Sequence, residues 1–78
     1  MTTWRPHPTK PNTWQVFAGW GRCIAAIRPQ KDGEQWEAAI RPRPDWHYPG
    51  MKISNFPNRE AGIAVIAREL AMHWPEVA

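Results

Sequence analysis

The sequence has few of the features that place a protein outside the cytoplasm. It contains a single cysteine, Cys23, so no disulfide can form within the chain. The uncharged run at residues 61–67 is far shorter than the roughly 20 apolar residues that cross a bilayer. Residues 1–8 hold prolines, an arginine and a histidine instead of the apolar stretch of a signal peptide. We therefore expect a cytoplasmic protein with no membrane segment.

Groups that perform catalysis or bind metals are also scarce. The three histidines lie at residues 7, 47 and 73, and neither their spacing nor a neighbouring cysteine or carboxylate makes a zinc site. Cys23 is expected on the inward face of a strand, where burial makes a thiol inert. No glycine-rich phosphate loop is present in the sequence. The sequence therefore predicts no enzyme, no metal site and no cofactor.

Proline and tryptophan, by contrast, are abundant, with nine and six copies among 78 residues. Proline lacks an N–H group and fixes φ, so this number divides the chain into short elements. Six tryptophans exceed what a core of this size requires, and tryptophan is enriched in binding hot spots. We expect some of the six at the surface; the alternative is that the small core is filled with large rings.

Residues 1–13 differ in composition from the rest of the chain. Pro6, Pro8 and Pro11 alternate with polar residues, a pattern that favours extended conformations and buries little surface. We expect a flexible, proline-rich arm here. A chain of this length holds one core, so residues 14–78 are expected to form a single domain.

The middle of the chain predicts a β-hairpin. Asp32-Gly33 lies between strand-like segments at residues 23–28 and 35–41, and this dipeptide favours a tight turn. A third strand is predicted at residues 51–55. In the first strand, strict alternation separates two faces: Cys23, Ala25 and Ile27 on one, and Arg22, Ile24, Ala26 and Arg28 on the other.

The last third of the chain predicts a helix. Asn58 is placed to cap it, Glu60 lies in the first turn, where the helix dipole favours an acid, and Pro75 ends it. The apolar residues expected to face the sheet are Ile63, Ile66, Ala67, Leu70, Ala71 and Trp74. The predicted fold is therefore α+β, a three-stranded antiparallel sheet packed against one C-terminal helix. A fourth short N-terminal strand is left open.

The loop at residues 41–52 is the most distinctive candidate binding site. Arginine, tryptophan and tyrosine are over-represented at the energetic centres of interfaces, and three prolines restrict this loop. An apolar strip opposite the predicted core face of the helix offers a second contact or a dimer surface. The residues expected to contact a partner are Arg41, Arg43, Trp46, His47, Tyr48, Val65 and Met72. The alternative is that Trp46 and Tyr48 fold back over the end of the sheet.

The distribution of charge favours a second kind of partner. Residues 1–43 carry seven basic and three acidic side chains, whereas residues 44–78 carry three and four. Arg22, Arg28 and Arg41 are expected on the sheet face away from the helix, where arginines are able to read a DNA groove. The alternative interface is therefore one with nucleic acid.

The order of these segments resembles that of small accessory proteins of bacteriophages and mobile elements. The resemblance covers about residues 20–74 and rests on Trp36, Ala38, Ile40, Phe56, Arg59, Glu60 and Ala61. More loosely, the chain is similar to the three-stranded arm-binding domains of phage integrases, in which the sheet enters DNA. Small phage proteins, the anti-CRISPR proteins among them, commonly act by occluding a host machine.

The leading interpretation is thus a non-catalytic binding protein in the cytoplasm of a bacterial host. It would act as a phage or mobile-element inhibitor or modulator that occludes a host protein or nucleoprotein complex. The alternative is a nucleic-acid-binding module that uses a basic sheet face and the N-terminal arm. A homodimer is a third option, since dimerisation would help so small a core.

Overall fold

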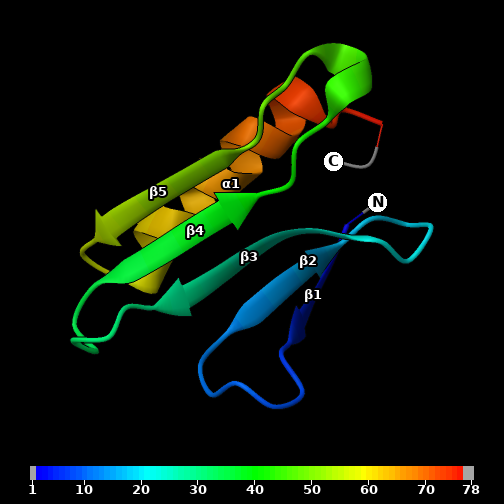
Figure 1. Ribbon diagram of the computed structural model, residues 1–78. Helices are drawn as coiled ribbons and strands as arrows, with labels where there is room; N and C mark the ends of the chain where they lie inside the picture. The colour runs from blue at the N-terminus through cyan, green and yellow to red at the C-terminus, as the bar shows by residue number, and fades with distance from the viewer. Residues whose placement is uncertain (1, 77–78) are drawn as a thin grey trace.

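Five β-strands and one α-helix make up the fold in the computed structural model, which describes residues 2–76 (Figure 1). In chain order the elements are β1 (Thr3–Pro6), β2 (Trp14–Phe17), β3 (Cys23–Pro29), β4 (Trp36–Ile40), a short 3-10 helix (Pro44–Trp46), β5 (Met51–Phe56) and α1 (Arg59–His73). The strands form one antiparallel sheet in the order β1-β2-β3-β4-β5, so each strand lies beside its neighbour in sequence. The predicted α+β class and the C-terminal helix on an antiparallel sheet are confirmed. The predicted number, three strands with a fourth left open at the N-terminus, is too low, since the described chain has five.

The predicted hairpin joins β3 to β4. Asp32 Oδ1 accepts hydrogen bonds from two backbone N–H groups that follow it in the turn, at 2.9 and 3.1 Å. Gly33 has a φ of +74°, which glycine adopts without strain. The turn joins β3 and β4 in a pairing that places Ala26 opposite Ala39.

The interpretation of residues 1–13 as a flexible arm is wrong for β1, which pairs with β2 over all four of its residues. Pro6 is tolerated there because β1 is an edge strand, where not every N–H has to be donated. The turn that follows is closed by a hydrogen bond from the His7 N–H to the Thr13 carbonyl at 2.7 Å. The His7 ring nitrogen Nδ1 also accepts two N–H groups of this turn, each at 3.1 Å. The proline-rich segment therefore forms an ordered turn between two strands.

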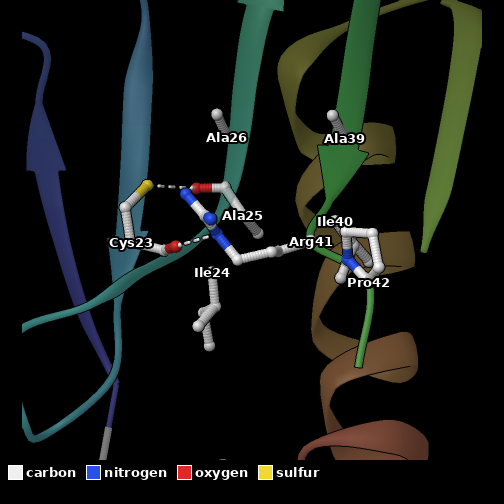
Figure 2. Close-up of a pocket in the computed structure, with 8 residues that line it drawn as sticks. All are labelled: Cys23, Ile24, Ala25, Ala26, Ala39, Ile40, Arg41 and Pro42. Carbon is white, nitrogen blue, oxygen red and sulfur yellow. Dashed lines mark hydrogen bonds between the residues drawn. The ribbon is translucent and has the colours of Figure 1, made fainter. Parts of the chain in front are cut away.

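A β-bulge at Ile24 changes which residues of β3 face the helix. Val16 pairs with Ala25 and Phe17 pairs with Cys23, so Ile24 is the extra residue. Ile24 and Ala25 are both buried, at 1% and 4% exposure, whereas the Cys23 sulfur lies on the other face of the sheet (Figure 2). The predicted alternation, with Cys23 inward and Ile24 outward, is wrong at this end of the strand because the bulge shifts the pattern by one residue.

Helix α1 begins after the predicted cap and ends before the predicted stop. The Asn58 side chain accepts the backbone N–H of Ala61 at 2.9 Å. At the other end the N–H of Trp74 donates to the Leu70 carbonyl at 2.7 Å. Pro75 comes next and has no N–H with which to continue the helix.

The face that α1 turns toward the sheet includes the predicted Ile63, Ile66, Leu70 and Trp74 but not the two predicted alanines. Gly62 is buried together with Ile66 and Leu70, whereas Ala67 and Ala71 are exposed. Gly62 allows close approach, because a Cβ atom at this position would contact a core isoleucine of β3. The helix is therefore rotated to place its glycine, rather than the two predicted alanines, against the sheet.

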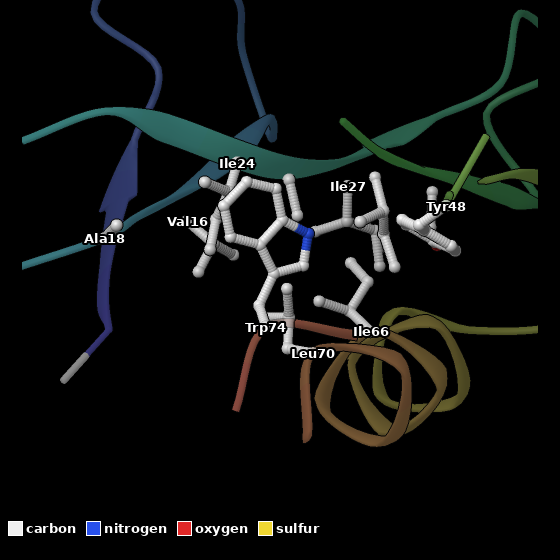
Figure 3. Packing of buried hydrophobic residues seen from close by; sticks show 11 residues of the cluster. Val16, Ala18, Ile24, Ile27, Tyr48, Ile66, Leu70 and Trp74 are labelled. Carbon is white, nitrogen blue, oxygen red and sulfur yellow. The ribbon is translucent and has the colours of Figure 1, made fainter. Parts of the chain in front are cut away.

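The core lies between α1 and one face of the sheet (Figure 3). Its buried apolar side chains are Val16, Ala18, Ile24, Ala25, Ile27, Ala38, Ile40, Tyr48, Ile66, Leu70 and Trp74. The helix packs mainly against β3, β4 and β5, and no described element covers the opposite face of the sheet (Figure 1). No helix within residues 2–76 is long and apolar enough to span a membrane.

Candidate nucleic-acid interface

The side of the sheet that α1 leaves uncovered is called the open face. Strand register places one straight row across it, Arg5 opposite Gln15, then Ala26, Ala39 and Lys52. Alternate residues of a strand share a face, which adds residues from the neighbouring rows. The residues that define the open face are Arg5, Gln15, Phe17, Cys23, Ala26, Arg28, Glu37, Ala39, Arg41 and Lys52.

Two shallow hollows lie over the open face and adjoin at Ala26 and Ala39, which line both. The first, of about 360 Å³, reaches Arg41 and Pro42 at the end of β4 (Figure 2). The second, of about 260 Å³, reaches Lys52 on β5. Because the two central side chains are single methyl groups, a ligand is able to approach the backbone of the sheet closely at this point.

Basic side chains outnumber acidic ones on the open face. Arg5, Arg28, Arg41 and Lys52 lie there with a single acid, Glu37. The excess on this face equals the formal net charge of the whole chain, +3. Basic and acidic residues elsewhere in the sequence balance in number. The positive charge of the protein is therefore concentrated on one side of the sheet.

The arginines of the open face are positioned by contacts that leave N–H groups free to bind a ligand. Arg28 Nε lies 2.8 Å from Glu37 Oε1. The Arg5 guanidinium lies 5.1 Å from the centroid of the Phe17 ring. Arg41 Nε donates to the backbone carbonyl at the start of β3 at 2.9 Å (Figure 2). A guanidinium has five N–H donors, so one contact does not exhaust its capacity to bind an anion.

Arg43, which the sequence predicts to contact a partner, is held within the fold. Its guanidinium lies 4.0 Å from the Trp46 ring centroid and 4.7 Å from that of Trp74. Its Nη1 donates to the His73 carbonyl at 2.9 Å. A hydrogen-bonded ion pair with Glu76 raises the pKa of Arg43 and lowers the pKa of Glu76. With 12% of its side chain exposed, Arg43 fastens the β4–β5 loop to the end of α1.

Tyr48 takes the alternative place anticipated for it and folds back over the end of the sheet. It is 8% exposed, and its ring stacks on His73 with the centroids 4.0 Å apart and the planes 12° apart. Burial, and secondarily the charge of Glu69, raises the pKa of its hydroxyl. The hydroxyl has no hydrogen-bond partner among the described residues. Tyr48 therefore acts as a core residue.

The other predicted contact residues are divided between three parts of the surface. Arg41 belongs to the open face. Trp46 and His47 lie in the β4–β5 loop, where Trp46 is 46% exposed and His47 adopts a φ of +54°. On α1, Met72 is 57% exposed and Val65 is half-buried.

The residues predicted for nucleic acid come together only in part. Arg28 and Arg41 lie on the open face, whereas Arg22 precedes β3 and lines a hollow beyond Pro42, next to the open face. Sequence reasoning misses Arg5, because the composition of residues 1–13 is that of an arm, and it does not select Lys52. The sequence carries one signal for Lys52: alternation along its strand predicts that its side chain lies on the face away from the helix.

Within residues 2–76, no group of three or more histidine, cysteine or acidic side chains is placed to hold a metal ion. No protein family, curated protein or solved structure matches this chain. The residues of the chain itself therefore carry the functional inference.

Proposed function

We propose that this protein binds nucleic acid through the open face of its sheet. One observation carries the proposal: basic residues exceed acidic ones by three on the face that α1 leaves uncovered, around two hollows that Ala26 and Ala39 both line. Phosphate contacts by lysine and arginine dominate the affinity of proteins for nucleic acid. The location of the charge therefore matters more here than its modest total.

The spacing of the basic residues suits an extended polyanion better than a small anion. Arg5 and Lys52 end a row that crosses all five strands, which at the usual spacing between strands is about 19 Å. Arg28 and Arg41 lie nearer the middle of the sheet, on β3 and at the end of β4. Separated cations of this kind match successive phosphates, and each guanidinium is able to bind a phosphate through two N–H groups.

The two central alanines support the same proposal. A large side chain at Ala26 or Ala39 would stand between the phosphates and the backbone of the sheet. A large apolar side chain there would also leave an exposed apolar patch, which favours protein partners over polyanions. The open face thus has small side chains at its centre and basic side chains around them, which makes it a shallow electropositive surface.

The test is the salt dependence of binding to fluorescein-labelled DNA, a 12-nucleotide strand and a hairpin duplex, between roughly 50 and 200 mM salt. We expect the association constant to fall steeply with salt for at least one of the two. Lys52→Gln should weaken binding severalfold and reduce the slope of the logarithmic plot by about 1.

The matched control is Arg68→Gln, which removes one positive charge from the exposed side of α1. It should leave both the affinity and the slope nearly unchanged. Absence of binding at the lowest salt, or equal effects of the two substitutions, would contradict the proposal.

A second candidate is the occlusion of a host protein complex by the exposed apolar side chains. Among the described residues, the large hydrophobic side chains left exposed are Trp20, Trp46 and Met72. Tryptophan at such a position is a typical hot-spot residue. Capture of a defined, nuclease-resistant complex by the wild type, and its loss with Trp46→Ala but not with Lys52→Gln, would favour this candidate.

A further inference from the structure

A third hollow lies next to the open face, at the end of the sheet where β4 leads into Pro42. It has a volume of about 250 Å³, and Pro42 borders both this hollow and the larger hollow of the open face. Trp20 and Arg22 line its far side. The hollow at Trp20 therefore adjoins the open face at Pro42. We name the line from Lys52 over the two alanines and Pro42 to Trp20 the track.

Trp20 is the aromatic residue at the end of the track. It is 57% exposed, and its ring lies 6.4 Å from that of Trp74, between centroids, with the planes tilted by 40°. Trp74 is itself 4% exposed and belongs to the core. One side of the Trp20 ring is therefore supported by the core, and more than half of the side chain remains open to a ligand.

The turn that carries Trp20 is held by backbone hydrogen bonds. The Ala18 N–H donates to the Arg22 carbonyl and the Gly21 N–H donates to the Ala18 carbonyl, both at 2.8 Å. Gly21 has a φ of +93°, which few other residues adopt. The ring is therefore presented by a defined turn that needs little ordering when a ligand binds.

The charges beside this hollow leave Arg22 as its free cation. Arg43 lines the hollow, but it is paired with Glu76 and lies 3.6 Å from Asp45. Both acids face the guanidinium of Arg43, which balances one of their two negative charges, and Arg22 balances the other in number. Arg22 is exposed and forms no ion pair in the part of the chain that the structure describes.

We infer that the nucleic acid bound by the open face is single-stranded, with one base stacked on the Trp20 ring. The inference rests on the proposed function. Bases in a duplex are already stacked on their neighbours, whereas a single strand offers bases whose faces are free for an aromatic side chain. A basic groove that ends in an exposed ring is the combination that binds single strands without sequence preference.

The test compares Trp20→Ala with Trp46→Ala on two probes, fluorescein-labelled dT12 and a DNA hairpin duplex. Trp46 is the matched control, because it is similarly exposed but contacts Arg43 and does not line the track. Trp20→Ala should weaken binding of dT12 about tenfold and leave binding of the duplex within twofold. Trp46→Ala should change neither by more than twofold. Trp20→Phe, which keeps a stacking ring, should retain most of the affinity and covers the case in which the alanine variant does not fold.

The outcomes separate this inference from the proposed function. Tighter binding of dT12 than of the duplex, with a loss specific to Trp20, supports both. Equal binding of the two probes, with no effect of Trp20→Ala, overturns the inference and leaves the proposed function intact. Failure of the wild-type protein to bind either probe overturns the proposed function and this inference with it.

Discussion

Ala26 and Ala39 lie directly opposite each other on β3 and β4, at the centre of the open face. Ala39 is exposed and Ala26 is half-buried, so neither residue contributes a side chain to the core. Their small size is unnecessary for packing against α1, which covers the other face. If the open face binds nucleic acid, the pair keeps its centre clear for a phosphate backbone.

Ala39→Glu should therefore weaken binding strongly without unfolding the protein. An acid at this exposed position should change the free energy of unfolding by no more than about 0.5 kcal/mol, which is usual for surface substitutions. The same acid would repel phosphates at the centre of the open face, and we expect the affinity for DNA to fall more than tenfold.

Ala64→Glu, on the exposed side of α1, is the matched control for this change in charge. Thermal unfolding measures the stability of the two variants, and fluorescence anisotropy measures their affinity for DNA. A similar loss of affinity in both would show that net charge, rather than its position, governs binding.

Arg43 is predicted to stabilise the fold and to be dispensable for binding. Arg43→Ala removes the contacts with two tryptophan rings, the hydrogen bond to the His73 carbonyl and the ion pair with Glu76. We expect Tm to fall by more than about 4 °C, beyond the range of surface substitutions in a domain of this size.

Arg43→Lys should recover only part of this loss, because an ammonium group does not stack on aromatic rings as a planar guanidinium does. Arg68→Ala serves as the surface control. An unchanged Tm in Arg43→Ala would contradict the structural role assigned to Arg43.

Tyr48→Phe should leave stability unchanged at neutral pH or raise it by up to about 1 kcal/mol, because the hydroxyl is buried and unpaired among the described residues. The sign of the pH effect follows from the raised pKa of Tyr48. The unfolded state releases the proton first, so the wild type loses stability as pH rises above about 10, the ordinary pKa of tyrosine.

The phenylalanine variant lacks that loss. Urea unfolding of both proteins at pH 7 and near pH 10.5 tests this difference. A phenylalanine variant that is less stable at pH 7 would indicate that the hydroxyl has a partner.

Gly62→Ala should destabilise the protein although it lies inside a helix. Alanine is normally favoured over glycine there by about 1 kcal/mol. At this position the added methyl group would overlap Ile27 Cδ1 and lie 3.4 Å from Phe56 Cδ2. We expect a net cost of about 1 to 3 kcal/mol.

Ile27→Val removes the overlapping atom and should itself cost about 0.5 to 1.5 kcal/mol. Because the two residues are in contact, the double variant should be more stable than the sum of the single effects. Chemical denaturation of the wild type, the two single variants and the double variant completes this double-mutant cycle. Strict additivity would show that the helix does not approach β3 this closely.

The sequence predicted the elements whose causes are local. The Asp32-Gly33 turn, the strand beginning at Met51, and the helix that Asn58 caps all depend on residues a few positions apart. The fold class followed from these elements. What could not be predicted depends on pairing between distant segments, as in β1, where prolines typical of a loop form an edge strand beside β2.

Two errors of orientation have the same physical origin. The bulge at Ile24 is visible only in the pairing of β2 with β3, and it reverses the side on which Cys23 lies. The rotation of α1 depends on how closely Gly62 packs against the sheet, which helical periodicity does not encode. For the site, Arg28 and Arg41 could be chosen from the sequence, whereas Arg5 became visible only once β1 was placed in the sheet.

The central claim is that the open face binds nucleic acid, and backbone amide chemical shifts of the labelled protein during titration with DNA test it most directly. Of the two DNA probes, the one that binds more tightly is the one to use. We predict that the largest changes fall on Ala26, Ala39 and Lys52, while Val65 and Met72 on α1 stay nearly unchanged. Changes centred on α1, with the open face unaffected, would contradict the claim.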